Sequence, residues 1–378
     1  MKKHLFLLLV LPLIVFSQQK KEVLFVGNSY TYGNNLPDLV KQISLSFGDT
    51  LIYDSSTPGG ATFNLHTTNT QTINKINQQA WDYVVLQAQS QEPSFSPSQV
   101  ANDTYPYAQQ LVNLIAANDS CTEPIFFMTW GRKYGDQQNC QFYPPICTYN
   151  GMQQRLRESY LEMTFNNNAT CAPVGMGWKK SIELDSTLNL FASDNSHPSI
   201  YGSYLSACTF YSTIFKKSCI GSTYWPNGID SITALSLQTI ATNTVLDSLS
   251  AWNIFNADFT YNQIGDSVSF TNLSSNYESL LLDFGDGQTS TAENPTHTYA
   301  VNGNYTVTLT AITNAACIQE METDNIVVNI STAIDELKAP KKLLEITDLL
   351  GRKTNATNNV PLLYRYDGGT VEKRVIVE

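Results

Sequence analysis

The sequence has little positive charge and few histidines. Its 378 residues include 22 Lys and Arg against 33 Asp and Glu, a formal net charge of −11. Because an acidic surface repels phosphate groups, nucleic acid is not expected as a partner. The chain has four histidines and no Cys-x-x-Cys motif, and this composition does not favour a zinc site. We therefore expect neither a metal nor another cofactor.

The sequence also lacks long apolar runs beyond its first residues. Lys2 and Lys3 precede an apolar stretch, residues 5–16, which is too short to cross a bilayer and is followed by Ser17. This pattern is typical of a secretory signal peptide, which we place at residues 1–17. No other segment approaches about 18 uninterrupted apolar residues. The mature chain is therefore expected to be exported and to have no transmembrane span.

Export gives the cysteines a structural meaning. Six of the seven lie between residues 121 and 219, and Cys317 stands apart. An even set in an oxidising compartment favours disulfides, although six cysteines allow 15 pairings. Cys140 and Cys147 are the nearest pair in sequence, and a bond between them would close a short loop that contains two prolines.

From residue 20 to about residue 251, short apolar runs alternate with longer amphipathic stretches. The short runs predict buried parallel strands, and the longer stretches predict helices. This alternation predicts an α/β fold, a three-layer sandwich around a parallel sheet. Such sheets carry their chemistry in loops beyond the carboxyl ends of the strands. The expected strands are residues 23–26, 83–86 and 125–128, and the expected helices are residues 35–47, 101–117 and 151–164.

Two stretches within this segment contain the residues of a serine hydrolase. Ser29 follows the first expected strand, and much later in the chain Asp194 and His197 stand three residues apart, so one turn can hold both. A serine hydroxyl becomes nucleophilic when a base accepts its proton and an acid orients that base. Neither motif is specific alone, but their joint occurrence favours a catalytic site. Asp185 is a weaker candidate for the acid, and His66 is more typical of a polar surface or helix histidine than of a base.

On these motifs the chain resembles the SGNH (GDSL-like) hydrolase family over residues 20–251. Gly27-Asn28-Ser29-Tyr30-Thr31 matches the first family block, with Asn and Tyr where the family name has Asp and Leu. The last block is matched by Asp194-x-x-His197. The resemblance implies that Ser29 is the nucleophile, that His197 is the general base and that Asp194 orients it.

The resemblance also implies an oxyanion hole made by the Ser29 N–H and two further donors. In a Pro-Gly-Gly-Ala-Thr segment that resembles the second block, Gly60 is the better match and Gly59 the alternative. The third block departs from the family, because Gln-Ala-Gln-Ser stands where the family usually has Gly-x-Asn-Asp. Gln89 takes the place of the Asn and offers the same amide donor on a longer stem. Gln87 is the alternative.

Residues 253–330 have a different composition, rich in Thr, Asn, Ser and Val. Alternating runs separated by turn residues, without a helical pattern, predict a β-sandwich there. On Asp283-Phe284-Gly285-Asp286-Gly287 and on residues 303–309 this segment resembles a PKD (polycystic-kidney-disease-type) domain, which is an immunoglobulin-like sandwich. The resemblance implies a spacer or contact module in which His297 has a structural role.

Residues 331–378 contain two strand candidates, residues 343–346 and 371–377, and a hairpin signal at Asp367-Gly368-Gly369. On residues 348–352 and 366–377 this segment resembles the type A sorting domain of the Bacteroidetes type IX secretion system. The resemblance implies the type IX secretion machinery as a partner, and a protein that is secreted or held at the cell surface.

These observations together predict a secreted serine esterase of SGNH type, which forms an acyl-enzyme on Ser29. Its partner would be an ester substrate, and the extracellular setting favours an acylated polysaccharide. Trp130 and Trp178 follow apolar runs, and we expect core packing for both rather than a place in the wall of the pocket. The alternative function is that of a non-catalytic cell-surface protein that binds carbohydrate or protein on the same fold.

Overall fold

The computed structural model describes residues 18–313, 317, 319–329 and 342–377. The chain divides into two compact units: the first contains residues up to Tyr299 and Asn304–Val327, and the second contains Ala300–Gly303 and the residues from Val328 onward. The predicted signal peptide lies outside the described residues. Within the described ranges, no helix combines the length and the apolar character needed to cross a membrane.

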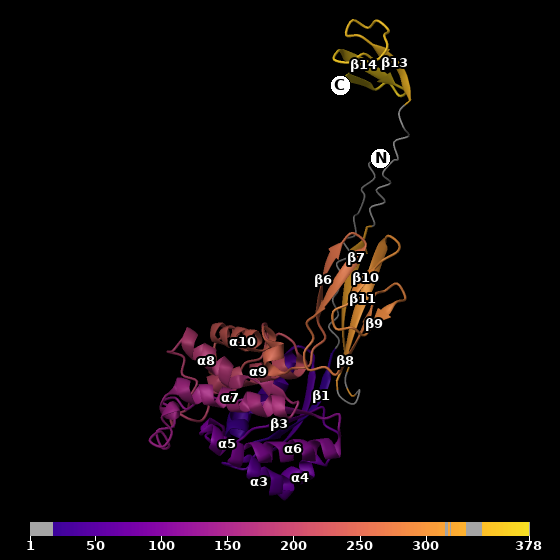
Figure 1. Ribbon diagram of the computed structural model, residues 1–378. Helices are drawn as coiled ribbons and strands as arrows, with labels where there is room; N and C mark the ends of the chain where they lie inside the picture. The colour runs from indigo at the N-terminus through magenta and orange to yellow at the C-terminus, as the bar shows by residue number, and fades with distance from the viewer. Residues whose placement is uncertain (1–17, 314–316, 318, 330–341, 378) are drawn as a thin grey trace, which may run out of the picture. The chain divides into compact units, whose positions relative to one another are not determined.

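A five-stranded parallel sheet forms the centre of the α/β domain (Figure 1). The strand order is β2-β1-β3-β4-β5, so β3 and β1 lie inside the sheet. Both contain runs of fully buried apolar residues, because helices cover both faces of such a sheet. The strands are β1 (Lys20–Val26), β2 (Thr50–Ser56), β3 (Tyr83–Leu86), β4 (Glu123–Phe127) and β5 (Thr170–Ala172).

Successive residues of β1 point into two different hydrophobic cores. Val23 and Phe25 pack with residues of α2, α8, α9 and α10, whereas Leu24 and Val26 pack with residues of α6 and α7. The expected three-layer α/β sandwich with a parallel sheet is therefore confirmed. Its helices are α1 (Ser29–Tyr32), α2 (Leu36–Ser46), α3 (Phe63–Thr68), α4 (Thr70–Ile76), α5 (Pro97–Asp103), α6 (Tyr105–Asn118), α7 (Tyr149–Asn166), α8 (Val174–Leu184), α9 (Ile200–Phe215) and α10 (Ser231–Leu246).

The elements predicted in this domain are found with small shifts of their ends. One prediction is wrong in detail: the single helix expected at residues 101–117 is broken at Thr104 into α5 and α6. Pro106 lies in the first turn of α6, where a missing N–H is tolerated. Inside one continuous helix the same proline would remove a backbone hydrogen bond and clash with the preceding turn, so α5 has to end before it. β2, β5 and the helices α1, α3, α4, α8, α9 and α10 were not among the predicted elements.

The segment after the α/β domain forms two antiparallel sheets, with strand orders β10-β7-β6 and β12-β11-β8-β9. Alternate residues are buried along β7 and β8, as expected for strands that contribute one face to a shared core. His297 stacks on Phe284, with 4.0 Å between ring centroids. The strands are β6 (Phe259–Ile264), β7 (Ser267–Asn272), β8 (Ser279–Asp283), β9 (Thr289–Ser290), β10 (Thr296–Thr298), β11 (Gly303–Ile312) and β12 (Gln319–Val328).

The second unit contains a three-stranded antiparallel sheet of β13 (Leu343–Thr347), β14 (Pro361–Tyr366) and β15 (Val371–Val375). The middle strand β14 was missed by the sequence prediction, although its alternate residues are buried. The predicted hairpin turn joins β14 to β15, and Gly368 and Gly369 there have φ values of 84° and 80°. Only glycine adopts this left-handed backbone without strain.

Four of the seven cysteines form disulfides, Cys121 with Cys317 and Cys140 with Cys147. The local pair was anticipated, but the expectation that Cys317 stands apart is wrong. The remaining cysteines of the 121–219 group are buried thiols, which lie in β5, in α9 and shortly after α9: Cys171, Cys208 and Cys219.

Candidate active site

The candidate nucleophile lies in a tight turn between β1 and α1. The strand ends at Val26, and Ser29 is the first residue of the helix. Asn28 caps this helix: its Oδ1 accepts a hydrogen bond from Tyr30 N at 3.1 Å, and its Nδ2 donates to Ala61 O at 3.0 Å. A capping side chain of this kind satisfies an N–H that the first helical turn leaves free. Ser29 is therefore held just beyond the carboxyl end of an inner strand.

Gln87 is buried beneath this turn and helps to fix it. Its Oε1 accepts hydrogen bonds from Asn28 N and from Thr31 Oγ1, both at 2.9 Å, and its Nε2 donates to Ala88 O. A Cβ at Gly27 would lie 2.4 Å from Thr31 Oγ1 and 2.7 Å from Gln87 Oε1, so the turn has no room for a side chain there. The polar atoms of Gln87 are thus engaged in structure rather than directed at a substrate.

His66 also supports the turn: of the two expected positions, surface or helix, it lies on a helix, and it is buried rather than at the surface. The side chain is fully buried on α3, with Nδ1 2.9 Å from Thr72 Oγ1 and Nε2 3.0 Å from Gly27 O. Since a carbonyl oxygen only accepts, Nε2 carries the proton. Burial lowers the pKa of His66 to about 4, so the ring is neutral near pH 7. Phe63, three residues earlier on the same helix, is also buried. Residues three apart lie on the same side of a helix, so the apolar Phe63 was the sequence signal that this side is buried.

The candidate acid and base come together with Ser29 from far along the chain. His197 Nε2 lies 2.8 Å from Ser29 Oγ across 168 residues of sequence, and Nδ1 hydrogen-bonds Asp194 Oδ2. The other oxygen of Asp194 accepts the backbone N–H groups of Ser196 and His197 at 3.0 and 2.9 Å. Asp185 does not take this place, since its carboxylate accepts from Thr187 instead.

The environment keeps the Asp194 carboxylate ionised. Partial burial acts to raise its pKa, but the hydrogen bonds from His197 and from the two backbone N–H groups outweigh burial and lower it below the ordinary value. The side chains of Asp194 and His197 are nevertheless 48% and 43% exposed. The pair therefore lies at an open rim that a bulky molecule can approach.

Buried aromatic rings lie beneath the turn that holds Ser29. The Tyr30 ring stacks on Trp130 at 4.6 Å, and Trp130 stacks on Trp178 at 3.9 Å. Tyr30 Oη lies 2.6 Å from Ser196 Oγ, and Trp130 Nε1 donates to Ser196 O at 3.0 Å. Both tryptophans are fully buried, which confirms the expected core packing. Their contacts fix the segment between Asp194 and His197.

A pocket of about 280 Å³ opens beside Ser29 and is lined by Gly60 and Gln89 among others. Gly60 has a φ of 69° and no heavy atom within 4 Å of a Cβ placed on it. Gln89 Oε1 accepts from Gln91 N at 2.7 Å, which orients the amide, and its Nε2 lies 3.3 Å from Gln91 Oε1. Of the two pairs of alternatives, Gly60 and Gln89 line this pocket, whereas Gly59 and Gln87 do not.

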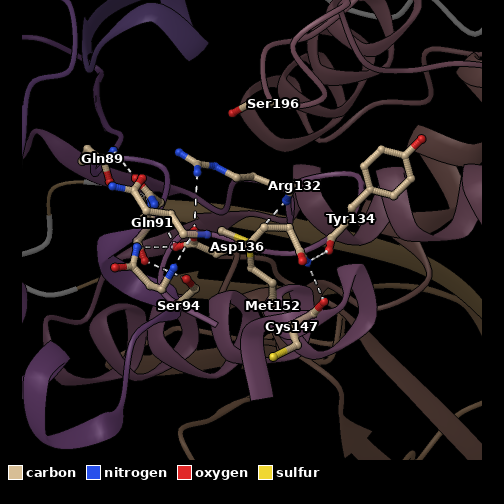
Figure 2. Close-up of polar contacts among 12 residues, drawn as sticks. Gln89, Gln91, Ser94, Arg132, Tyr134, Asp136, Cys147, Met152 and Ser196 are labelled. Atoms are coloured by element: carbon tan, nitrogen blue, oxygen red, sulfur yellow. Dashed lines mark hydrogen bonds and ion pairs between the residues drawn. The ribbon is translucent and has the colours of Figure 1, made fainter. Parts of the chain in front are cut away.

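The sequence prediction missed Arg132, which lines the same pocket. Figure 2 shows its guanidinium beside Asp136, in a network that continues through Gln91 to Gln89. Its position in the sequence could have indicated this place, because Arg132 comes soon after the carboxyl end of β4, where sheets of this kind bind their ligands. Among the described residues, no group of three or more His, Cys, Asp or Glu side chains could hold a metal ion.

Comparison with known proteins separates the two parts of the first unit. Residues 257–328 match the PKD domain family, and a comparison with curated proteins finds no match. A crystal structure of a PKD1 domain from a Vibrio cholerae metalloprotease is 39% identical and covers 19% of this chain and 94% of its own, with a TM-score of 0.19.

Solved structures similar to the α/β domain include a DUF4886 family protein from Bacteroides uniformis. It is 18% identical and covers 60% of this chain and 95% of its own, with a TM-score of 0.51. A protein assigned as an SGNH hydrolase from Slackia heliotrinireducens is 24% identical and covers 52% and 99%, with a TM-score of 0.43. The chain thus joins an α/β domain with the fold of the DUF4886 family protein to a PKD domain at residues 257–328.

Proposed function

We propose that this protein is a serine esterase of SGNH type that works through Ser29, His197 and Asp194. One observation carries the proposal: the imidazole of His197 lies 2.8 Å from Ser29 Oγ through Nε2 and holds Asp194 through Nδ1. In this order of contacts the imidazole can accept the proton of the serine, while the acid fixes the tautomer of the imidazole.

In the proposed reaction, Ser29 Oγ attacks the ester carbonyl and His197 takes its proton. The negative charge that develops on the carbonyl oxygen is stabilised by N–H groups of Ser29, Gly60 and Gln89, three residues that line the pocket. Collapse of this intermediate expels the alcohol, which receives the proton from His197. Water, activated by the same imidazole, then attacks the acyl-enzyme and releases the acid.

An acylated polysaccharide fits the proposal as substrate. The pocket beside Ser29 is small, about 280 Å³, so it suits a short acyl group. The half-exposed rim at Asp194 and His197 leaves space for a large alcohol part outside it. The PKD domain is consistent with a role outside the cell.

We propose that the protein reaches the surface through its signal peptide and the type IX secretion machinery. Deleting residues 331–378 tests the second step, because a chain that lacks its sorting segment should remain in the periplasm. The measurement is the distribution of the protein between culture medium, outer surface and periplasm. Unchanged secretion of the shortened chain would refute the sorting assignment.

The catalytic proposal is tested by labelling the mature protein with a fluorophosphonate and by assaying para-nitrophenyl butyrate. Ser29→Ala should abolish both labelling and turnover, and Asp194→Asn should lower kcat by at least about 100-fold because the tautomer of His197 is no longer fixed. Asp185→Asn is the matched control, with turnover like that of the parent. Labelling that persists in Ser29→Ala, or equal rates in parent and Ser29→Ala, would instead favour the non-catalytic binding protein.

A further inference from the structure

Arg132 brings a positive charge into the candidate active site of an acidic protein. The chain has a formal net charge of −11, yet Arg132 is the one Lys, Arg, Asp or Glu among the described residues that line the pocket at Ser29. Its side chain is 25% exposed, so part of it faces solvent from inside a concave site. A cation in this place attracts an anionic group on the substrate.

The guanidinium is held in place by a buried carboxylate. Arg132 Nη1 lies 3.6 Å from Asp136 Oδ1, and the Asp136 side chain is fully buried. Asp136 Oδ2 accepts Gln91 Nε2 and Asn139 Nδ2, each at 2.8 Å, while Oδ1 accepts the N–H groups of Gln138 and Asn139. The Asp136 carboxylate accepts hydrogen bonds from four N–H groups of other residues. It therefore holds Arg132 through an ion pair and leaves the N–H donors of the guanidinium available.

Asp136 is an anion in this setting. Burial acts to raise its pKa, but the hydrogen bonds from Asn139 and Gln91 and the charge of Arg132 outweigh burial, so the net pKa is lowered. The anchor therefore stays charged at neutral pH. Its loop is closed by the Cys140–Cys147 disulfide, and Gln137 Nε2 donates to Cys147 O at 3.0 Å.

Arg132 has hydrogen-bonding capacity that the protein leaves unused. Its Nε is buried and has no hydrogen-bond partner, although a guanidinium presents five N–H donors. Figure 2 shows one nitrogen of Arg132 in contact with Asp136 while the far end of the group points away from that carboxylate. Because Nε has no access to solvent, a ligand in the pocket would meet the exposed part of the side chain, which is 25% exposed.

We propose that the ester substrate carries a carboxylate group near the bond that is cleaved, and that Arg132 binds this carboxylate. The inference rests on the proposed esterase function. A planar carboxylate matches the two parallel N–H groups of a guanidinium, which makes the pair specific as well as strong. The carboxylate can belong to the acyl part, as in a half-ester of a dicarboxylic acid, or to the alcohol part, as in an acylated hydroxy acid.

Two matched pairs of esters distinguish these sources. In the first pair the acyl part differs, and para-nitrophenyl hydrogen adipate is compared with para-nitrophenyl hexanoate. In the second pair the alcohol part differs, and para-acetoxybenzoate is compared with its methyl ester. The quantity measured is the ratio of kcat/KM for the charged ester to that for its neutral partner.

We expect the parent protein to prefer the charged member of one pair, and Arg132→Gln to lower that ratio roughly 10- to 100-fold, mainly through KM, because a hydrogen bond to a charged group is worth about 1.5–3 kcal/mol. Arg132→Lys keeps the positive charge but loses the paired N–H groups of the guanidinium, so its ratio should lie between those of the parent and Arg132→Gln. The matched control is Lys133→Gln, which removes an equal charge from the next residue, where Nζ bonds Asn189 Oδ1 at 3.1 Å; its ratio should stay within about twofold of the parent.

Three outcomes would overturn the assignment: no preference for a charged ester, a ratio that Arg132→Gln leaves unchanged, or an equal fall in kcat for both members of a pair. The last would show that Arg132 acts on the oxyanion or on the fold. Thermal unfolding of both Arg132 variants identifies a folding defect. If neutral esters are hydrolysed in a Ser29-dependent way without any effect of Arg132, only this inference fails; if Ser29→Ala has no effect, the proposed function fails as well.

Discussion

Two glutamines two residues apart differ in what their amides can do. Gln87 is fully buried and its oxygen accepts from the nucleophile turn, whereas Gln89 is partly exposed and lines the pocket at Ser29. The sequence left both as candidates for the oxyanion donor. The geometry favours Gln89. A hydrogen bond from Gln91 N to its Oε1 orients the amide, and the side chain that carries the Nε2 donor stays partly exposed.

Alanine substitutions should separate the two glutamines. We expect Gln89→Ala to lower kcat about 100- to 1000-fold with little effect on stability, as for the loss of one oxyanion donor. Gln87→Ala should instead lower the free energy of unfolding by about 1–3 kcal/mol, since it leaves the buried N–H of Asn28 without an acceptor. Ester kinetics and urea unfolding measure the two effects. A large loss of kcat in Gln87→Ala with unchanged stability would reverse the assignment.

His66 gives the fold a dependence on acidity. Its pKa is lowered from 6.5 to about 4 by burial, and a histidine with a depressed pKa stabilises the fold fully above its unfolded value and loses that effect as the pH falls. Between pH 7 and pH 4 the contribution of His66 should decline by about 3 kcal/mol. The five tryptophans all lie within residues 20–252, so their fluorescence during urea unfolding reports on this domain.

The comparison must be made between the parent and His66→Gln at each pH. Burial raises the pKa of Glu92 to about 7, and a raised carboxyl pKa acts in the opposite direction, because its stabilisation is lost as the pH rises from about 4.5 to 7. Glu92 is present in both proteins, so the difference between them isolates His66. A difference in unfolding free energy that does not change with pH would contradict the assigned role.

At the scale of elements, the β1–α1 turn joins several of these contacts. Gly27→Ala places a methyl group within 3 Å of Thr31 Oγ1 and Gln87 Oε1, so the turn must shift. We expect a loss of about 1–3 kcal/mol in stability, as for other overpacked sites, together with a fall in kcat. Gly59→Ala is the control, because its Cβ would meet only Tyr32 Oη at 3.9 Å. Equal behaviour of the two variants would argue against a steric role for Gly27.

Elements could be predicted from the sequence where burial leaves a regular pattern of apolar residues. β1 and β3 are inner parallel strands and appear as apolar runs, and α2 has one apolar face. β2 is an edge strand with mostly exposed or half-exposed residues, so it has no such run. α9 is buried on nearly all sides and therefore lacks the amphipathic period by which a helix is predicted.

The same limit applies to the site. Ser29, Asp194 and His197 could be proposed from the sequence because short motifs contain them. The supporting contacts are long-range: Gln87 and Asn28 are 59 residues apart, and His66 and Gly27 are 39 residues apart. No local pattern encodes which buried amide or imidazole will meet which backbone group. Those roles follow only from the packing of the folded domain.

At the scale of the molecule, the disulfide Cys121–Cys317 connects two domains. Cys121 precedes β4 of the parallel sheet and Cys317 precedes β12 of the PKD domain. The ion pair between Lys216 and Glu320 adds a second link. A single proteolytic cut between residues 121 and 317 should therefore leave the two fragments joined until a reductant is added.

The remaining cysteines should be unreactive in the folded protein. Burial raises the pKa of Cys171 to about 12 and also raises that of Cys208, whereas hydrogen bonds from Cys208, Thr242 and Ser212 outweigh burial and lower the pKa of Cys219. The thiolate is the reactive form, but all three side chains are fully buried, so a reagent does not reach them in the folded protein. Titration with a thiol reagent should find no thiol in the native protein, three after unfolding and seven after unfolding with a reductant. Fewer than three thiols in the unfolded, unreduced protein would show a third disulfide.

The sequence separation of 168 between Ser29 and His197 would also determine, in the proposed mechanism, when the protein can first act. During synthesis Ser29 emerges long before His197, and in the proposed mechanism its hydroxyl is inert without that base. Docking of the segment that precedes α9 completes the pair, and this segment rests on the buried ring of Trp130. Under the proposed function, hydrolysis would begin only at the end of folding, so a chain in transit would not attack esters of the cell that makes it.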